Sequence, residues 1–247
     1  MSLLADLADL VLPSPCAGCA TDRVPLRFGA CAACVARLEA LRPYATAPSP
    51  PPPGMPPCVA AGPYAGPLRG ALLAYKEKGR HRLARPLGAL LATAVAGLAP
   101  RRGPVVLIPV PSTAAAARER HGDHMTRLAA HAVRRLRAGG WDAVVSHPLE
   151  ALPRPDSTSL GVSGRLAAAE SSLRIRRPRI GFPRRATPRK GTLVVVDDIV
   201  TTGATLAAVT GRLEEAEMQV TGAAVLAATQ LRRRPGGGIS GIVSRRH

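Results

Sequence analysis

The chain has 247 residues, of which 46% are hydrophobic and 2% aromatic, so Leu, Val and Ala must fill most of its core. This length allows one sizeable core plus a small appended module. No apolar run approaches the roughly 20 residues that a membrane helix needs, which excludes a membrane-spanning class of protein.

The formal net charge of +18 has two interpretations. A strongly basic chain attracts nucleic acids and other phosphate-bearing partners. However, only three of the 34 basic residues are Lys, and Ala, Gly and Pro are abundant, which is the composition that GC-rich coding produces for any function. The charge therefore leaves the choice of partner open.

The first 15 residues, MSLLADLADLVLPSP, predict a short amphipathic helix. A signal peptide would carry a basic n-region, and its apolar stretch would not be interrupted by Asp6 and Asp9. Apolar side chains recur at helical spacing instead, at Leu3, Leu4, Leu7, Leu10 and Val11. We therefore expect a cytoplasmic protein.

Four of the five cysteines follow the pattern Cys16-x2-Cys19-x11-Cys31-x2-Cys34. Two CxxC knuckles at this spacing are typical of a tetrahedral thiolate site, which predicts structural Zn²⁺. Disulfides are the alternative, and they need an oxidising compartment. A pair of redox CxxC motifs is a third interpretation. We place this four-cysteine zinc module, with the preceding helix, at residues 1–42.

Eight prolines between Pro43 and Pro57 predict an extended linker over residues 43–59, which also contains the fifth cysteine, Cys58. An α/β domain is expected over residues 60–230. The segment after Gln230 is rich in Arg and Gly and is expected to be a basic tail over residues 231–247.

Apolar strands alternate with helices along this domain, which predicts a parallel sheet covered by helices on both faces. The first expected helix has two pieces and is broken near Gly79. One further helix is expected after each of two strands, and residues 152–189 are expected to be irregular. The expected strands are 105–110, 143–146, 192–197 and 220–228, and the expected helices are 68–98, 114–137 and 204–217.

A buried strand is expected to end at two adjacent carboxylates, Asp197 and Asp198, which are costly to bury without donors or a metal. The chain then turns into a helix, so backbone N–H groups and hydroxyls face one spot at the positive end of the helix dipole. These features predict a ligand with a phosphate beside a polyol, such as a phosphorylated sugar. The alternative is a plain strand–turn–helix whose polar residues only cap the helix. The turn consists of Thr201, Thr202, Gly203, Ala204 and Thr205.

The whole run from Val194 to Thr205 resembles the signature of type I phosphoribosyltransferases, which bind 5-phosphoribosyl-1-pyrophosphate (PRPP). The resemblance implies that Asp197 and Asp198 bond the ribose hydroxyls and that Thr201–Thr205 hold the 5-phosphate. It also implies that Mg²⁺ accompanies PRPP. The turn at Val110, Pro111 and Ser112 is similar to the pyrophosphate loop of that fold, although an ordinary strand exit has the same appearance. Arg154 and Arg165, in the expected closing segment, are candidates for neutralising the leaving group.

The order of motifs along nearly the whole chain resembles the ComF family, phosphoribosyltransferase-like proteins linked to bacterial DNA uptake and competence. The pieces that carry this resemblance are Pro15–Cys19, Tyr75-Lys76, Ile108–Pro111 and Val194–Thr205. The family implies a hood over about residues 64–100 and a place for Tyr75 and Lys76 near the substrate.

The chain departs from the family pattern in its loops. Many members have Arg-Gly-Phe-Asn-Gln after the Pro-Val-Pro turn, where this chain has Arg120, His121, Gly122, Asp123 and His124. A metal site formed by the two histidines and Asp123 is one interpretation, and solvated loop or helix-start residues are the other. These departures affect the acceptor side and leave the ribose-phosphate residues unchanged.

Two functions follow from these patterns. The first is a PRPP-binding phosphoribosyltransferase that releases pyrophosphate and uses an unidentified acceptor. The second is a non-catalytic accessory protein of competence and DNA uptake that binds single-stranded DNA and uses PRPP only as a ligand. With 2% aromatic residues, the chain has few stacking platforms for the second function.

Overall fold

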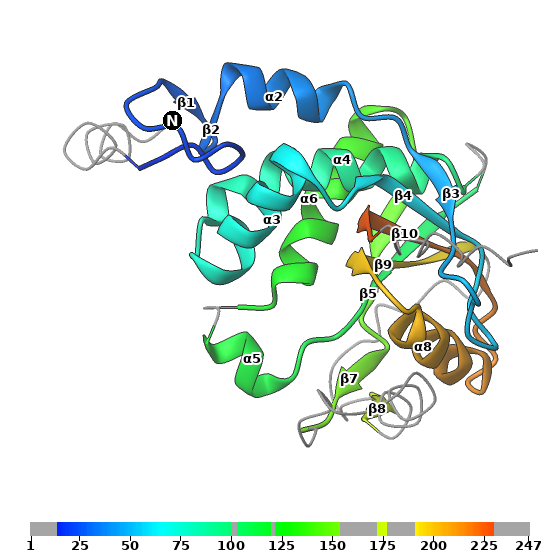
Figure 1. Cartoon of the computed structure of the whole chain (residues 1–247). Coiled ribbons are helices and arrows are strands. Elements are labelled where there is room, and N and C mark those ends of the chain that lie inside the picture. The colour runs from blue at the N-terminus through cyan, green and yellow to red at the C-terminus, as the bar shows by residue number, and fades with distance from the viewer. Residues whose placement is uncertain (1–13, 100–102, 120–121, 154–171, 177–190, 230–247) are drawn as a thin grey trace, which may run out of the picture.

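The computed structural model describes residues 14–99, 103–119, 122–153, 172–176 and 191–229. Its centre is a six-stranded sheet with the order β3-β4-β10-β9-β5-β6 (Figure 1). All neighbouring strands are parallel except the edge pair β3–β4, which is antiparallel. The strands are β3 (Tyr44–Thr46), β4 (Cys58–Pro63), β5 (Val105–Pro109), β6 (Ala143–Val145), β9 (Thr192–Val200) and β10 (Val220–Ala228).

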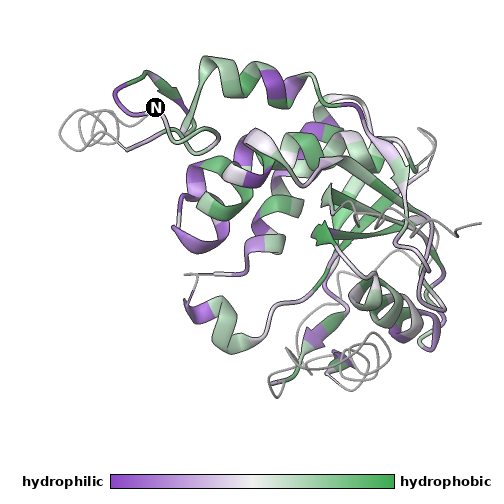
Figure 2. Ribbon diagram, in the orientation of Figure 1, coloured by the Kyte–Doolittle hydropathy of each residue, from purple (hydrophilic) through white to green (hydrophobic). Residues whose placement is uncertain are grey.

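Helices and a small hairpin cover the two faces of this sheet, which confirms the expected α/β class (Figure 1). Alternate residues of β9 point to opposite faces, because Val194 and Val196 join one core cluster whereas Leu193 and Val195 join the other. The first cluster packs under α3 (Gly66–Glu77), α4 (Ala84–Ala96) and α6 (His124–Ala138). The second packs under α8 (Ala204–Glu214) and the hairpin of β7 (Leu149–Ala151) and β8 (Leu173–Ile175). Figure 2 shows the resulting hydrophobic sheet between helices with hydrophilic outer residues.

The expected break near Gly79 is confirmed. Helix α3 ends before Gly79, whose φ of +61° lies in the left-handed region that favours glycine. A short 3-10 helix, η1 (His81–Leu83), then leads into α4. The expected helix over residues 114–137 is divided into α5 (Ala114–Glu119) and α6.

The prediction that residues 43–59 form only a linker is wrong. Tyr44–Thr46 form β3, and β4 begins at Cys58, so both ends of the Pro-rich segment belong to the main sheet. Proline lacks an N–H donor and is tolerated beside an edge strand, which is where Pro43 and Pro48 flank β3. Cys58 is a buried residue of the core, with 5% of its surface exposed.

The prediction that the strand ends at Asp197 is also wrong. Strand β9 continues to Val200, since β10 pairs with it as far as Ala228↔Val200. On its other side, β5 stops pairing at Pro109↔Val196. The two carboxylates therefore lie inside a strand, at the point where β9 loses one of its neighbours.

The four-cysteine module contains β1 (Leu26–Arg27), β2 (Ala30–Cys31) and α2 (Ala32–Glu39). It packs closely on α3, because a Cβ on Gly70 would lie 2.5 Å from the carbonyl oxygen of Ala17. The side chain of Arg80 also donates to the carbonyl of Pro15 at 2.7 Å. The expected N-terminal helix, Arg154, Arg165 and the basic tail lie outside the described residues. Within the described ranges, no helix has the length and apolar character needed to cross a membrane.

Two glycines in helices allow a matched test of the packing between α4 and α6. A Cβ on Gly88 would overlap His131 and approach the carbonyl oxygen of Leu128 at 3.0 Å, whereas a Cβ on Gly211 in α8 meets nothing within 4 Å. We expect Gly88→Ala to lower the free energy of unfolding by about 1–3 kcal/mol through overpacking. We expect Gly211→Ala to raise it by about 0.5–1 kcal/mol, because alanine favours the helix. Urea unfolding measures both, and equal effects of the two changes would contradict this packing.

Candidate functional site

The candidate site lies where β5 and β9 end beside each other. Residues Pro109 and Val196 pair, and the backbone N–H of Val110 then donates to the carbonyl of Val196 at 3.0 Å. The turn at Val110, Pro111 and Ser112 is thereby fixed next to Asp197 and Asp198. Ligands of open α/β sheets bind in the crevice beyond the carboxyl ends of parallel strands. The structure brings two of the predicted loops together at that edge.

The carboxylate of Asp198 is buried, with 5% of the residue exposed. Its Oδ2 atom lies 2.7 Å from Nζ of Lys76 and 3.0 Å from Nε2 of His124. Burial by itself would raise the pKa of Asp198, but the hydrogen bond from His124 and the charge and hydrogen bond of Lys76 outweigh it and hold the pKa below its usual range. Asp198 is therefore ionised at neutral pH.

Asp197 has the opposite character. Burial, followed by the neighbouring Asp198 charge, raises the pKa of Asp197 well above its usual range. The backbone N–H of Asp198 donates to Oδ1 of Asp197 at 2.9 Å, and this hydrogen bond offsets only part of the rise in the pKa of Asp197. Strand β9 thus presents an ionised carboxyl at Asp198 and, at the adjacent position and towards the other face of the sheet, a readily protonated carboxyl at Asp197.

The turn after β9 forms the start of helix α8. Gly203 is the N-cap, with a φ of +75°, and it has no side chain with which to cap the helix. The N–H groups of the first helical turn have no partner within their own helix, so they can bind an anion such as phosphate. Thr201 is exposed, and Thr202 and Thr205 are half-buried on either side of this turn.

The Pro-rich segment packs on the same turn. A Cβ on Gly203 would lie 2.5 Å from Sδ of Met55 and 3.2 Å from side-chain carbons of Pro48 and Pro52. Glycine is therefore required there by both the backbone conformation and the space. This contact was not predicted, because residues 43–59 were expected to be an extended linker.

Sequence reasoning also missed His124, for which solvated loop or helix-start positions were favoured. It does begin α6, but only 9% of it is exposed, and its ring contacts both Asp198 and Ser112. Asp123 caps the helix by accepting from the N–H of Thr126 at 2.9 Å, and its Oδ2 accepts from the N–H of Ser112 at 3.2 Å. His121 lies outside the described residues.

Tyr75 and Lys76 have different positions despite being adjacent. The ring of Tyr75 is 2% exposed, and its hydroxyl donates to the backbone carbonyl of His124 at 2.9 Å. Lys76 alone of the two reaches a carboxylate. Tyr75 thus supports the site from the core, and Lys76 supplies positive charge to it.

The four predicted metal ligands, Cys16, Cys19, Cys31 and Cys34, form a cluster whose sulfur atoms all lie within 4.8 Å of one another. Sulfurs bound to one Zn²⁺ at 2.3 Å in a tetrahedron lie about 3.8 Å apart. The Sγ atoms of Cys19 and Cys31 are 3.8 Å apart, and Sγ of Cys16 accepts from the N–H groups of Gly18 and Cys31. The cluster therefore has the donors and the dimensions for zinc.

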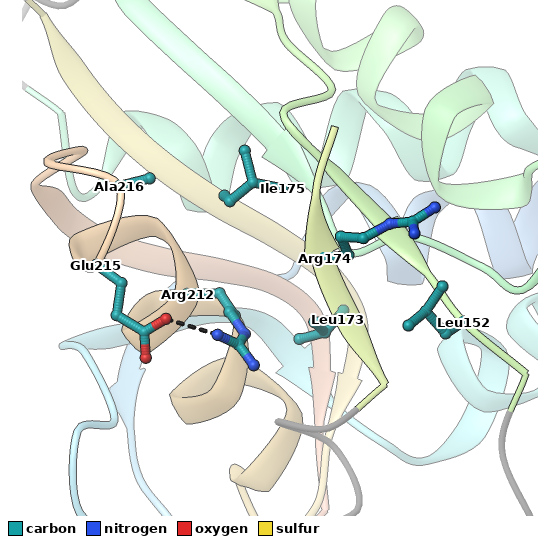
Figure 3. A pocket seen from close by; sticks show the side chains of 7 residues that line it. All are labelled: Leu152, Leu173, Arg174, Ile175, Arg212, Glu215 and Ala216. Carbon is teal, nitrogen blue, oxygen red and sulfur yellow. Dashed lines mark hydrogen bonds and ion pairs between the residues drawn. The ribbon is translucent and has the colours of Figure 1, made fainter. Parts of the chain in front are cut away.

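A pocket of about 390 Å³ lies away from the carboxylates, between the β7–β8 hairpin and the end of α8 (Figure 3). An ion pair between Arg212 and Glu215 at 2.7 Å borders it. None of the residues predicted to bind a ligand lines this pocket, so its position does not support a role in that site. Its lining consists of Leu152, Leu173, Arg174, Ile175, Arg212, Glu215 and Ala216.

Comparison with known protein families gives one finding. Residues 117–236 match the model of the phosphoribosyl transferase domain. The match includes α6, β9, the turn at Thr201–Thr205, α8 and β10. Among curated proteins, no significant match is found.

The cysteine cluster predicts a metal content. We expect the purified chain to carry one Zn²⁺, and we expect Cys31→Ser to lose most of it, because three thiolates hold zinc less tightly than four. The control is Cys58→Ala, which removes the fifth cysteine without touching the cluster. Elemental analysis of the dialysed proteins measures the stoichiometry, and unchanged zinc in Cys31→Ser would refute the four-thiolate site.

Proposed function

We propose that this chain, which carries a phosphoribosyl transferase domain over residues 117–236, binds PRPP with Mg²⁺ and transfers the phosphoribosyl group to a nitrogenous acceptor. The observation that carries the proposal is the meeting of the Asp197-Asp198 pair, the α8 N-terminus and the Val110–Ser112 turn at one sheet edge. Each of these elements matches a different part of PRPP.

In this proposal, Asp197 and Asp198 bind the two ribose hydroxyls. Their different protonation tendencies suit a pair of groups that both donate and accept. The turn from Thr201 to Thr205 holds the 5-phosphate with N–H groups and hydroxyls. The Val110–Ser112 turn lies on the pyrophosphate side.

The reaction exchanges one bond at the anomeric carbon. The C–O bond to pyrophosphate breaks and its electron pair leaves with pyrophosphate, while the lone pair of the acceptor nitrogen forms the new C–N bond. Bound Mg²⁺ would spread the charge of the leaving group. The residues of the chain orient the ribose and stabilise charge, and Lys76, whose Nζ lies 2.7 Å from Asp198, is the described cation nearest to this edge's carboxylates.

The cysteine cluster and the order of motifs favour a ComF-like role within this framework. A structural Zn²⁺ on Cys16, Cys19, Cys31 and Cys34 would hold the small module together, since its own cluster of buried residues consists of only Cys16, Ala30 and Cys34. A ComF-like protein would act in DNA uptake and competence. Binding of single-stranded DNA is therefore the second candidate function.

One feature of the surface favours this second function. A groove of about 540 Å³ lies between the cysteine module and helices α4 and α6, and four arginines border it. Two of them, Arg27 and Arg85, lie over the ring of Phe28 at 5.8 and 4.8 Å. Positive charge beside an aromatic ring is the combination that binds single strands without sequence preference. The other two arginines are Arg42 and Arg135.

The first test is calorimetric titration with PRPP and Mg²⁺. We expect the native chain to bind, and we expect Asp197→Asn with Asp198→Asn to weaken binding at least about tenfold, because each lost charged hydrogen bond removes appreciable free energy. The control is Asp142→Asn. Asp142 is an exposed acid that immediately precedes β6, at the opposite end of the parallel strands from the candidate site. Thermal melting confirms that each variant is folded. Absence of binding by the native chain would refute the proposed function.

The second test measures affinity for single-stranded DNA against salt concentration. We expect Arg85→Ser with Arg135→Ser to reduce the slope of log K against log salt by about 1.4, as expected for two lost phosphate contacts. Arg174→Ser with Arg212→Ser removes the same charge from arginines that pair with Glu150 and Glu215, and it serves as the control. Equal slopes for the two variants would exclude the groove as the DNA site.

A further inference from the structure

Two side chains from separate parts of the chain converge on the buried carboxylate of Asp198. Lys76 comes from the end of α3, and His124 comes from the start of α6. Behind the histidine, Nδ1 of its ring lies 3.3 Å from the hydroxyl of Ser112, which follows β5. The imidazole thus forms a bridge between the carboxylate on β9 and the turn on the pyrophosphate side.

We propose that His124 is a positioning residue that joins the two halves of the PRPP site by holding Asp198 with one ring nitrogen and Ser112 with the other. This inference rests on the proposed function, and it assigns to His124 a role in orienting the Asp198 carboxylate that is proposed to bind the ribose. His124 does not touch the reacting atoms in this arrangement. It acts through Asp198 and Ser112.

The protonation pattern of the bridge follows from its neighbours. Asp198 is ionised and can only accept, so Nε2 of His124 carries the hydrogen and donates to Oδ2. The other ring nitrogen, Nδ1, makes the contact with the hydroxyl of Ser112, which can donate to a ring nitrogen without a hydrogen or accept from one that carries a hydrogen.

The surrounding contacts fix the imidazole in place. Tyr75 donates to the backbone carbonyl of His124, and Asp123 caps the helix that His124 begins. Asp123 also accepts from the N–H of Ser112, so the serine is held at both its backbone and its hydroxyl. A side chain that is 11% exposed and contacted through both ring nitrogens has little freedom to turn.

The bridge explains why a histidine fits at this position. Its two ring nitrogens point in opposite directions, so one side chain reaches a carboxylate and a hydroxyl on different loops. A glutamine amide also offers a donor and an acceptor, although it is not aromatic and lacks the ring's rigidity. Leucine has a similar bulk but would leave the buried carboxylate without one of its two partners.

The test compares three variants by titration with PRPP and Mg²⁺. We expect His124→Leu to weaken binding about tenfold or more, because the Asp198 carboxylate loses a charged hydrogen bond. We expect His124→Gln to stay within about threefold of the native chain, because the amide restores a donor. His147→Leu is the matched control, since His147 also contacts α6, through Thr126 at 3.0 Å, and it is exposed. Equal affinity of His124→Leu and the native chain, or of the Leu and Gln variants, would overturn the role of His124.

A second measurement keeps the inference testable if His124→Leu fails to fold. Two-dimensional ¹H–¹⁵N NMR of the histidine rings in the native chain should show His124 with its hydrogen on Nε2, and Asp198→Asn should alter that signal while His147 is unchanged. A hydrogen on Nδ1 alone in the native chain would refute the bridge. Failure of the native chain to bind PRPP would instead refute the proposed function, whichever nitrogen carries the hydrogen.

Discussion

The burial of an ionised carboxylate at Asp198 is the constraint on which the arrangement of the site depends. An uncompensated charge in the protein interior is very costly, and removing one partner of a buried pair typically costs about 3–5 kcal/mol. Asp198 avoids this cost only because Lys76 and His124 both contact its Oδ2 atom. Helix α3, which carries Lys76 near its end, and helix α6, which begins at His124, are therefore both held against β9 through contacts with this one oxygen atom. The other oxygen, Oδ1, takes no part in these two contacts.

The strand pairing explains why the acidic pair lies at the carboxyl end of β5, beside the turn that follows it. Strand β9 keeps its neighbour β10 as far as Val200, so its backbone stays regular beyond the carboxylates. Its other neighbour, β5, ends at Pro109, although the N–H of Val110 still donates to the carbonyl of Val196. The chain of β5 then leaves the sheet through the Val110–Ser112 turn, which this hydrogen bond holds beside the acids.

The sequence was most informative where local pattern and chemistry coincide. The apolar run Val194–Val196, the two acids and the glycine of the turn are contiguous, so the strand, the carboxylates and the helix start were all predicted together. The cysteine cluster was predicted for the same reason, because the spacing of its two CxxC pairs is a local pattern that predicts four thiols close together.

Two features escaped prediction because their causes are distant in the chain. His124 stands among polar residues and reads locally as a solvated helix start, but the group that buries it, Asp198, is 74 residues away. Strand β3 is only three residues long and has prolines on both sides, so it has no signal of its own. Pairing with β4 alone makes it a strand. Lys76 was indicated only by family resemblance, since a lysine at a helix end has no local feature that marks a carboxylate partner.

Helix α3 connects the cysteine module to this carboxylate. At its start, a Cβ on Gly18 of the first knuckle would lie 3.2 Å from Pro67, and in its middle the backbone of Gly70 lies against the carbonyl of Ala17. Lys76, in its last turn, reaches Asp198. Only glycine permits such a close approach at position 70, because any side chain would push the helix away from the knuckle. Helix α3 is thus held by the cysteine module at one end and bears Lys76, the charge partner of Asp198, at the other. Because the helix is rigid, the position of Lys76 depends on the first cysteine knuckle, although the knuckle and Asp198 lie in different parts of the molecule.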